Sequence, residues 1–332
     1  MRLSILDQAP ISSNQTAHEA LNESMKLAQM GEKLGYTRYW IAEHHDLPGL
    51  ACPAPEVMLS YIGAHTSTIR IGSGAVLLPH YKPYKVAEVY NMLATLFPGR
   101  IDIGIGRAPG GSAEASNALS DNFLQQVWNM PKSVTELLHF LENDFPSEHE
   151  YKNLRASPVP PVPPAPWLLG TSKKSALLAA EKGISYAFGQ FMSENNGPEI
   201  IQKYLDTFQP RTHWQKPEVI LTVNVICAEK DEEAEEIALS SIIWSLQKSK
   251  GEGNGVPSIA QAKQYPLDDK DLQTIEKMKQ NMIIGNPKKV IKKLNELVSL
   301  FHADEIMLVT ITNSAEDRVK SYQLIAEEAF HI

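Results

Sequence analysis

The stretch 100–111, RIDIGIGRAPGG, alternates apolar residues with Asp or Gly and then ends in an arginine. Successive side chains of a strand point to opposite faces, so Asp102, Gly104 and Gly106 share one face. The isoleucines between them share the other face, which belongs against covering helices. We therefore expect a buried strand whose glycine face leaves room for a flat ligand, with Arg107 at its carboxyl end.

A dinucleotide-binding glycine loop is the first alternative for this stretch. The pattern fails, because Pro109 stands at the third glycine position and three strand–helix units precede it. An arginine at the end of a strand suits bidentate contact with a phosphate. For Arg107 an ion pair with a neighbouring carboxylate on the rim stays open as the second interpretation.

Short apolar runs alternate with helical patterns along the whole chain. Strands are expected at 2–8, 37–45, 68–78, 100–107, 165–170, 184–191, 218–228 and 303–311. Helices are expected at 17–35, 53–66, 83–97, 172–183, 232–248 and 314–330. This alternation predicts parallel strands with right-handed crossovers. Eight such units favour a (β/α)8 TIM barrel over a doubly wound sheet.

The predicted barrel takes up residues 1–332 as a single domain with an insertion between the seventh and eighth strands. That connection contains a glycine-rich run, SKGEGNGVPS, and is too long for one helix. We expect a mobile insertion around 250–270 that serves as a lid at the active-site end. A surface loop without a role is the alternative.

Composition narrows the class of protein. The chain has 43% apolar and 21% charged residues and a formal net charge of −8, which argues against nucleic acid or an anionic membrane as partner. Cys52 and Cys227 are far apart and indicate a reducing compartment. The N-terminus does not resemble a secretory signal, and no apolar run reaches the roughly 18–20 residues that span a bilayer. These features predict a cytoplasmic protein.

A second candidate for anion binding lies in 168–178, LLGTSKKSALL. This segment places Gly170, Thr171, Ser172 and Ser175 at a strand-to-helix junction. Free N–H groups, hydroxyls and the positive end of the helix dipole meet there and suit an anion. The alternative is that Thr171 or Ser172 simply caps the following helix. Helix capping and anion binding are compatible.

The run AEHHD at 42–46 closes the second expected strand. Adjacent strand residues point to opposite faces, so we do not expect His44 and His45 to share an ion, and we predict no metal site. One inward imidazole that acts as acid, base or hydrogen-bond donor is more natural, although periodicity does not say which histidine it is. In the third expected strand, Gly74 and Ala75 would lie close to a flat ligand or form a bulge.

Four stretches together resemble the bacterial luciferase family, closest to its luciferase-like flavin-dependent monooxygenase branch: YWIAEHHDLPG, IRIGSGAVLLPHYKPYKVAE, FPGRIDIGIGRAPGG and PWLLGTSKKSA. The similarity runs in the same order over essentially the whole chain. It implies a (β/α)8 barrel, a homodimer, and reduced FMN or the deazaflavin F420 bound at the carboxyl ends of the strands.

The resemblance also implies roles for individual residues. Arg107 would hold the flavin phosphate, joined by Ser172 and Ser175. Gly74 and Ala75 would form the family's non-prolyl cis peptide beneath the isoalloxazine ring. The family's active-site histidine would correspond to His44.

Two positions depart from luciferase itself. Gly106 stands where luciferase has a reactive cysteine, and Thr171 stands where it has an acidic residue. We therefore expect neither light emission nor a long-chain aldehyde substrate.

The function implied by the resemblance is a flavin-dependent monooxygenase. A separate flavin reductase would supply FMNH2, oxygen would add at flavin C4a, and an unidentified small organic substrate would be oxidised, with His44 handling protons. An F420-dependent hydride-transfer oxidoreductase on the same barrel, a non-catalytic FMN-binding protein and an unrelated barrel enzyme for a sugar phosphate are the alternatives.

Overall fold

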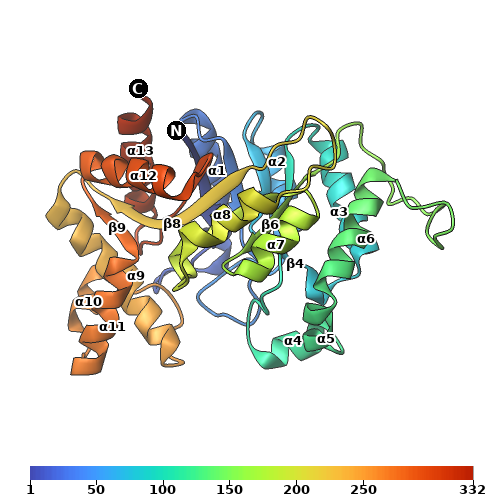
Figure 1. The fold of residues 1–332 in the computed structure, drawn as a ribbon. Helices are drawn as coiled ribbons and strands as arrows, with labels where there is room; N and C mark the ends of the chain where they lie inside the picture. Colours follow the sequence, from blue (N-terminus) through green and yellow to red (C-terminus); the bar gives the residue numbers. More distant parts are fainter. Residues whose placement is uncertain (332) are drawn as a thin grey trace.

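Eight parallel strands close into a barrel in the computed structural model, which describes residues 1–331 (Figure 1). In order around the ring they are β1 (Arg2–Asp7), β2 (Arg38–Ile41), β3 (Arg70–Ser73), β5 (Ile101–Gly106), β6 (Ala165–Gly170), β7 (Ser185–Gly189), β8 (Val219–Cys227) and β10 (Glu305–Val309). β10 pairs with β1 on one side and β8 on the other, so the sheet closes on itself. The predicted (β/α)8 fold is confirmed.

Two short strands supplement the ring. β4 (Val76–Leu77) follows β3 and pairs with β5, while β9 (Met282–Gly285) pairs with the second half of β8. The sequence carried no usable signal for β9, because four residues are too few to show a period.

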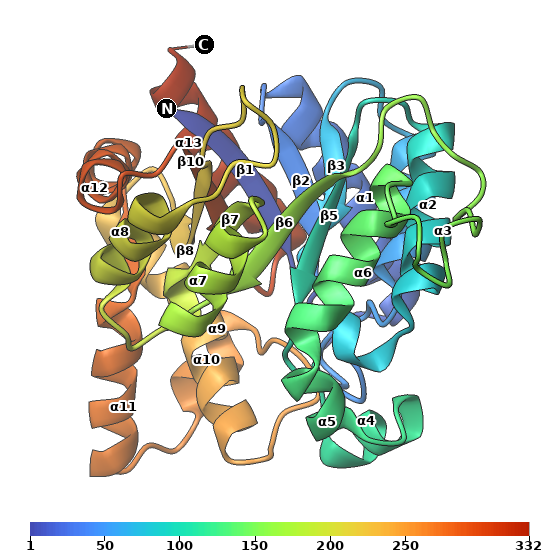
Figure 2. The same cartoon turned by 45° about the vertical axis from the view of Figure 1, so that its right-hand side comes forward.

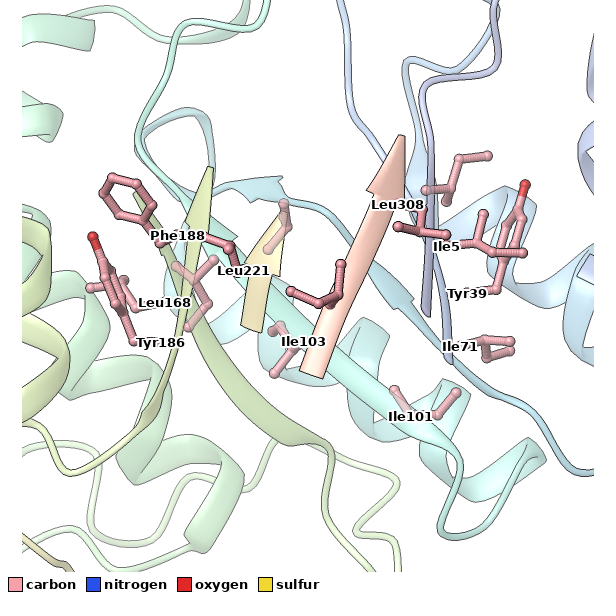
Figure 3. Packing of buried hydrophobic residues seen from close by; sticks show 14 of the residues in the cluster. Ile5, Tyr39, Ile71, Ile101, Ile103, Leu168, Tyr186, Phe188, Leu221 and Leu308 are labelled. Atoms are coloured by element: carbon pink, nitrogen blue, oxygen red, sulfur yellow. The ribbon is translucent and has the colours of Figure 1, made fainter. Parts of the chain in front are cut away.

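Helices cover the outside of the barrel (Figure 2). They are α1 (Ala17–Lys33), α2 (Pro55–Ala64), α3 (Pro83–Leu96), α6 (Met130–Glu142), α7 (Lys173–Glu181), α8 (Gly197–Thr207), α12 (Pro287–Phe301) and α13 (Ala315–Phe330). Ile101, Ile103 and Ile105 point into the apolar layer between strands and helices, as predicted, and Figure 3 shows the first two there. None of the helices in residues 1–331 combines the length and apolar character that crossing a bilayer requires.

Local chemistry sets where several helices begin. Thr16 and Glu19 form a capping box at the start of α1, each side chain satisfying a backbone N–H of the other residue. Pro55 and Pro83 stand in the first turns of α2 and α3, where a missing N–H costs nothing.

Two expected strands are shorter than predicted. β2 ends at Ile41 rather than residue 45, because the backbone of His44 bonds to the Cys52 carbonyl and leaves the sheet. The AEHH residues therefore lie in a loop, where the alternation of faces does not apply. The stretch 68–78 forms two strands, β3 and β4, separated by a cis peptide bond between Gly74 and Ala75.

The connection between β5 and β6 holds helices that the sequence analysis does not predict. α4 (Ala113–Leu119) and α5 (Phe123–Trp128) project from the end of the barrel at which the strands finish, and α6 returns along its side (Figure 2). Seven and six residues are too few for a visible helical period. α8 and α12 are likewise not predicted.

The predicted insertion follows β8, the seventh strand of the ring. It holds α9 (Asp231–Ser249), α10 (Ile259–Gln264), α11 (Asp269–Gln280), β9 and α12. Within 250–270, Val256 is fully buried and its backbone exchanges hydrogen bonds with Ile11 and Ser13. This contact fixes one point of the insertion on the loop after β1, and its mobility stays a prediction.

A buried ion cluster fills the amino-terminal end of the barrel. Arg38 donates to Asp102 at 2.8 Å and to Glu305 at 2.8 and 3.0 Å, and all three side chains are almost completely buried. Asp102 also accepts from Trp40 at 3.0 Å and from Arg70. Asp102 therefore faces the barrel interior, as predicted, and the Arg38 guanidinium joins β2 to β5 and β10.

Replacing Arg38 tests this cluster. Arg38→Met should lower the free energy of unfolding by about 3–5 kcal/mol, because two buried carboxylates lose their shared cation. Urea denaturation measures this loss in the free energy of unfolding. Lys85→Met is the matched control, since Lys85 is 69% exposed and pairs only with Glu88 among residues 1–331, and it should cost under about 1 kcal/mol. Equal losses in the two variants would contradict the assignment.

Candidate functional site

A cavity of about 320 Å³ lies at the carboxyl ends of the strands, the end at which α4, α5 and α10 are seen in Figure 2. Barrel enzymes place their sites at this end. Nine of the predicted site residues line it: His44, Gly74, Ala75, Gly106, Arg107, Gly170, Thr171, Ser172 and Ser175. The wall is completed by Leu6, Gln8, Ala42, Glu43, Leu77, Ala108, Gly110, Leu169, Ala187, Gly189, Phe191, Met192 and Thr222.

Arg107 and the start of α7 form a cationic corner of the cavity. The Arg107 guanidinium is exposed and donates to the Ser172 hydroxyl at 3.4 Å. Within residues 1–331 it makes no ion pair, so the alternative of a carboxylate on the rim is not what the structure shows. The corner is open to an anion from outside the chain.

Ser172 is also the N-cap of α7. Its hydroxyl accepts the Ser175 N–H at 3.3 Å, while the Ser175 hydroxyl donates to the Ser172 carbonyl at 2.7 Å. The N-cap interpretation is confirmed, and it coexists with the position beside Arg107. The amino end of α7 therefore lies at this corner of the cavity. Its helix dipole adds to the positive potential that Arg107 creates there.

Backbone rather than long side chains lines the part of the cavity beside Gly106. The cis peptide of Gly74 and Ala75 lies next to Gly106 on β5. A Cβ added to Gly106 would lie 2.9 Å from the Ala75 Cβ, closer than van der Waals contact allows. Any other residue at Gly106 would therefore displace this wall. Because Gly106 has no side chain, the backbone here offers a flat surface suited to a planar ligand.

Gly104 is the one predicted cofactor-binding residue that does not line the cavity. A Cβ there would collide with the Ser73 carbonyl oxygen, and the Ser73 hydroxyl donates to the Gly104 carbonyl at 3.0 Å. The space that Gly104 leaves is therefore taken up by the close approach of β3. Strand alternation predicts the face correctly but not what fills it.

His44 is the histidine that reaches the cavity. Its Nδ1 is buried and has no hydrogen-bond partner within residues 1–331. Burial lowers the pKa of His44 to about 4, and electrostatic interaction with Lys248 and His45 acts in the same direction. At neutral pH the imidazole is uncharged and able to accept a proton or a hydrogen bond.

His45 turns away and pairs instead with Glu43, which the sequence analysis does not single out. The Glu43 carboxylate is 3% exposed and accepts from His45 Nε2 at 2.8 Å, the Tyr81 hydroxyl at 2.7 Å and the Leu77 N–H at 3.0 Å. It thus fastens the loop after β2 to β4. Only the fold brings these partners together, so no local signal identifies Glu43.

No three His, Cys, Asp or Glu side chains of residues 1–331 form a cluster that could hold a metal ion.

A cationic corner, a flat backbone wall and a neutral histidine around one cavity at this end of a parallel barrel define an enzyme site. Residues 1–303 match the family model described as luciferase-like monooxygenase. The chain belongs to this family, and it is an oxidoreductase of the monooxygenase class. The resemblance inferred from the four sequence stretches is confirmed.

Individual relatives are similar over almost their full length. The N-acetyl-S-alkylcysteine monooxygenase of Bacillus subtilis (strain 168) is 37% identical, with 98% of each chain covered. The crystal structure of apo-MsnO8 is 34% identical with a TM-score of 0.89, covering 98% of this chain and 97% of that one. The oxygenating constituent of 3,6-diketocamphane monooxygenase from Pseudomonas putida, in complex with FMN, has a TM-score of 0.72 and 19% identity over 99% and 97%. That last likeness shows the fold alone.

The depressed pKa of His44 makes a prediction about pH. The native state resists protonating His44 until pH about 4, whereas an unfolded histidine takes up its proton near 6.5. Between these values the unfolded state binds more protons, so stability falls as the pH falls. From pH 7 to pH 4, wild type should lose about 3 kcal/mol more than His44→Gln in urea denaturation. Parallel pH profiles for the two proteins would contradict the buried neutral imidazole.

Proposed function

We propose that this chain is a flavin-dependent monooxygenase that uses reduced FMN and O2 to oxidise a small organic substrate. The proposal rests on one cavity that is lined both by Arg107 and Ser172 and by the backbone of Ala75 and Gly106. A phosphate and a planar ring joined by a flexible chain match this pair of surfaces.

The residues present fit FMN on two counts. Arg107 has no carboxylate partner within residues 1–331, so its charge is available to a phosphate, with Thr171 and Ser172 beside it. The backbone of Gly74 and Ala75, next to Gly106, offers the ring a wall without side-chain obstruction. When bound, reduced FMN supplies the electrons that let one oxygen atom of O2 enter the substrate while the other leaves as water.

His44 is the residue we propose for proton transfer. Its imidazole is neutral at pH 7 and lines the cavity, and its Nδ1 has no hydrogen-bond partner among residues 1–331. Glu43 holds the loop that carries it, so we assign Glu43 a positioning role. The enclosing apolar residues, among them Leu77, Leu169 and Phe191, exclude water from the reacting groups.

The name of the Bacillus subtilis relative suggests the kind of substrate. It is a monooxygenase of N-acetyl-S-alkylcysteine, a small organic molecule with an oxidisable sulfur. At 37% identity over nearly the whole chain, this relative favours oxygenation over F420-dependent hydride transfer here. We propose a substrate of comparable size without naming it.

We further propose a separate flavin reductase as partner and a homodimer as the assembled state. The adjoining helices α2 and α3 expose Val57, Tyr61, Met92 and Leu96, which a second copy would cover. We propose a cytoplasmic location, which is supported by the buried free thiols of Cys52 and Cys227.

Arg107→Ala should weaken the binding of reduced FMN by about 10- to 100-fold, because a charged hydrogen bond to the phosphate is lost. Anaerobic titration measures the affinity. Arg155→Ala, which removes an exposed arginine outside the cavity, is the matched control and should leave the affinity unchanged. Equal affinities for wild type and Arg107→Ala would refute the phosphate assignment.

Mixing the anaerobic complex with oxygen tests the reaction itself. The proposal expects slow reoxidation with a long-lived flavin–oxygen absorbance, since the apolar cavity shields the reacting atoms. Immediate reoxidation to free peroxide, with no oxygenated product from a thioether panel, would favour a non-catalytic flavin-binding protein. Binding of F420 but not of reduced FMN would favour the hydride-transfer alternative.

A further inference from the structure

A second cavity of about 550 Å³ adjoins the first, and we call it the outer cavity. It lies between α5, α6 and α7. Arg107, Leu169 and Ser175 line both cavities, so the outer one continues outward from the phosphate corner. Its volume lies in the range of small-ligand sites. The proposed function accounts for the first cavity and leaves the outer cavity without an occupant.

The charged side chains that line the outer cavity are all positive. Arg107 and Lys174 are its charged lining residues, and both are cations exposed to solvent. Neither makes an ion pair within residues 1–331. Arg107 stands at the junction with the first cavity and Lys174 lies one residue before the shared Ser175. Two neighbouring cations, Arg107 and Lys174, complement a pair of linked phosphates better than they complement a single phosphate.

Apart from these cations, mostly apolar side chains line the outer cavity, and the indole ring of Trp128 is exposed there. Trp128 is 80% exposed and Leu124 is 82% exposed, and both line it. They stand four residues apart on α5 and so share one face of that helix. Phe123 anchors the helix from another side by stacking on His80, with ring centroids 4.8 Å apart. The Trp128 face is thus held in place and remains free for a planar partner.

We propose that the outer cavity binds the adenylate half of a flavin dinucleotide, so that this chain accepts reduced FAD as well as reduced FMN. The flavin phosphate lies at Arg107, the second phosphate meets Lys174, and the adenine ring stacks on Trp128. This inference rests on the proposed function, because it requires the flavin phosphate at Arg107. Base stacking on an exposed aromatic side chain is a known source of affinity.

The test is a pair of anaerobic titrations of the full chain with reduced FMN and reduced FAD. Wild type should bind reduced FAD about tenfold more tightly than reduced FMN. Trp128→Ala should remove this difference and leave the affinity for reduced FMN unchanged, while Trp128→Phe should retain most of it. Lys174→Gln should also reduce the preference for the dinucleotide.

Trp214→Ala is the matched control. Trp214 is 86% exposed but lines a surface at the amino-terminal end of the barrel, beside Arg38 and Asp102. Its removal should change neither affinity. Because Trp128 and Trp214 are both exposed, both variants should fold, which thermal unfolding verifies.

Several outcomes would overturn the inference. Equal affinity of wild type for the two flavins, or an undiminished preference in Trp128→Ala, removes the adenylate site while the proposed function stands. If Trp128→Ala alters self-association or the binding of a reductase but not the flavin preference, the α5 face belongs to a protein interface. If neither flavin binds, the proposed function fails, and this inference fails with it.

Discussion

The contact between β5 and the β3–β4 segment is the constraint on which the site depends. Gly104 admits the Ser73 carbonyl, and Gly106 admits Ala75, so the two segments approach more closely than side chains would allow. This approach brings the Gly74–Ala75 peptide to the cavity wall and fixes where β5 ends. Arg107, the next residue, thereby lines the same cavity as this backbone surface.

The two ends of the barrel use charge in opposite ways. At the amino-terminal end, Arg38, Asp102 and Glu305 satisfy one another in a closed, buried cluster. At the carboxyl end, Arg107 has no acidic partner within residues 1–331, and His44 is kept neutral by burial. Paired charges at one end hold the strands together, whereas unpaired polar groups at the other remain available to a ligand.

The loops decide which histidine serves the site. His44 and His45 are neighbours in the sequence, and strand alternation would have placed them on opposite faces. The backbone leaves the sheet after Ile41, and Glu43 then draws His45 toward Tyr81 and Leu77. His44 is left facing the cavity. The choice therefore follows from a buried carboxylate whose partners come from two different segments of the chain.

The barrel, the order of its eight strands and the family are predictable from local sequence, because they depend on periodicity and on motifs of adjacent residues such as GIGRAPGG and LLGTSKKSA. The same local patterns place Arg107 and Ser172 just after the ends of two strands, and both line the cavity. The surroundings of Gly104, Glu43 and the α5 face follow only from the tertiary structure. Each of these depends on atoms far away in the sequence: the Ser73 carbonyl, the Leu77 amide and the surface of α7. Local pattern predicts which face a residue occupies, but only packing decides what meets it there.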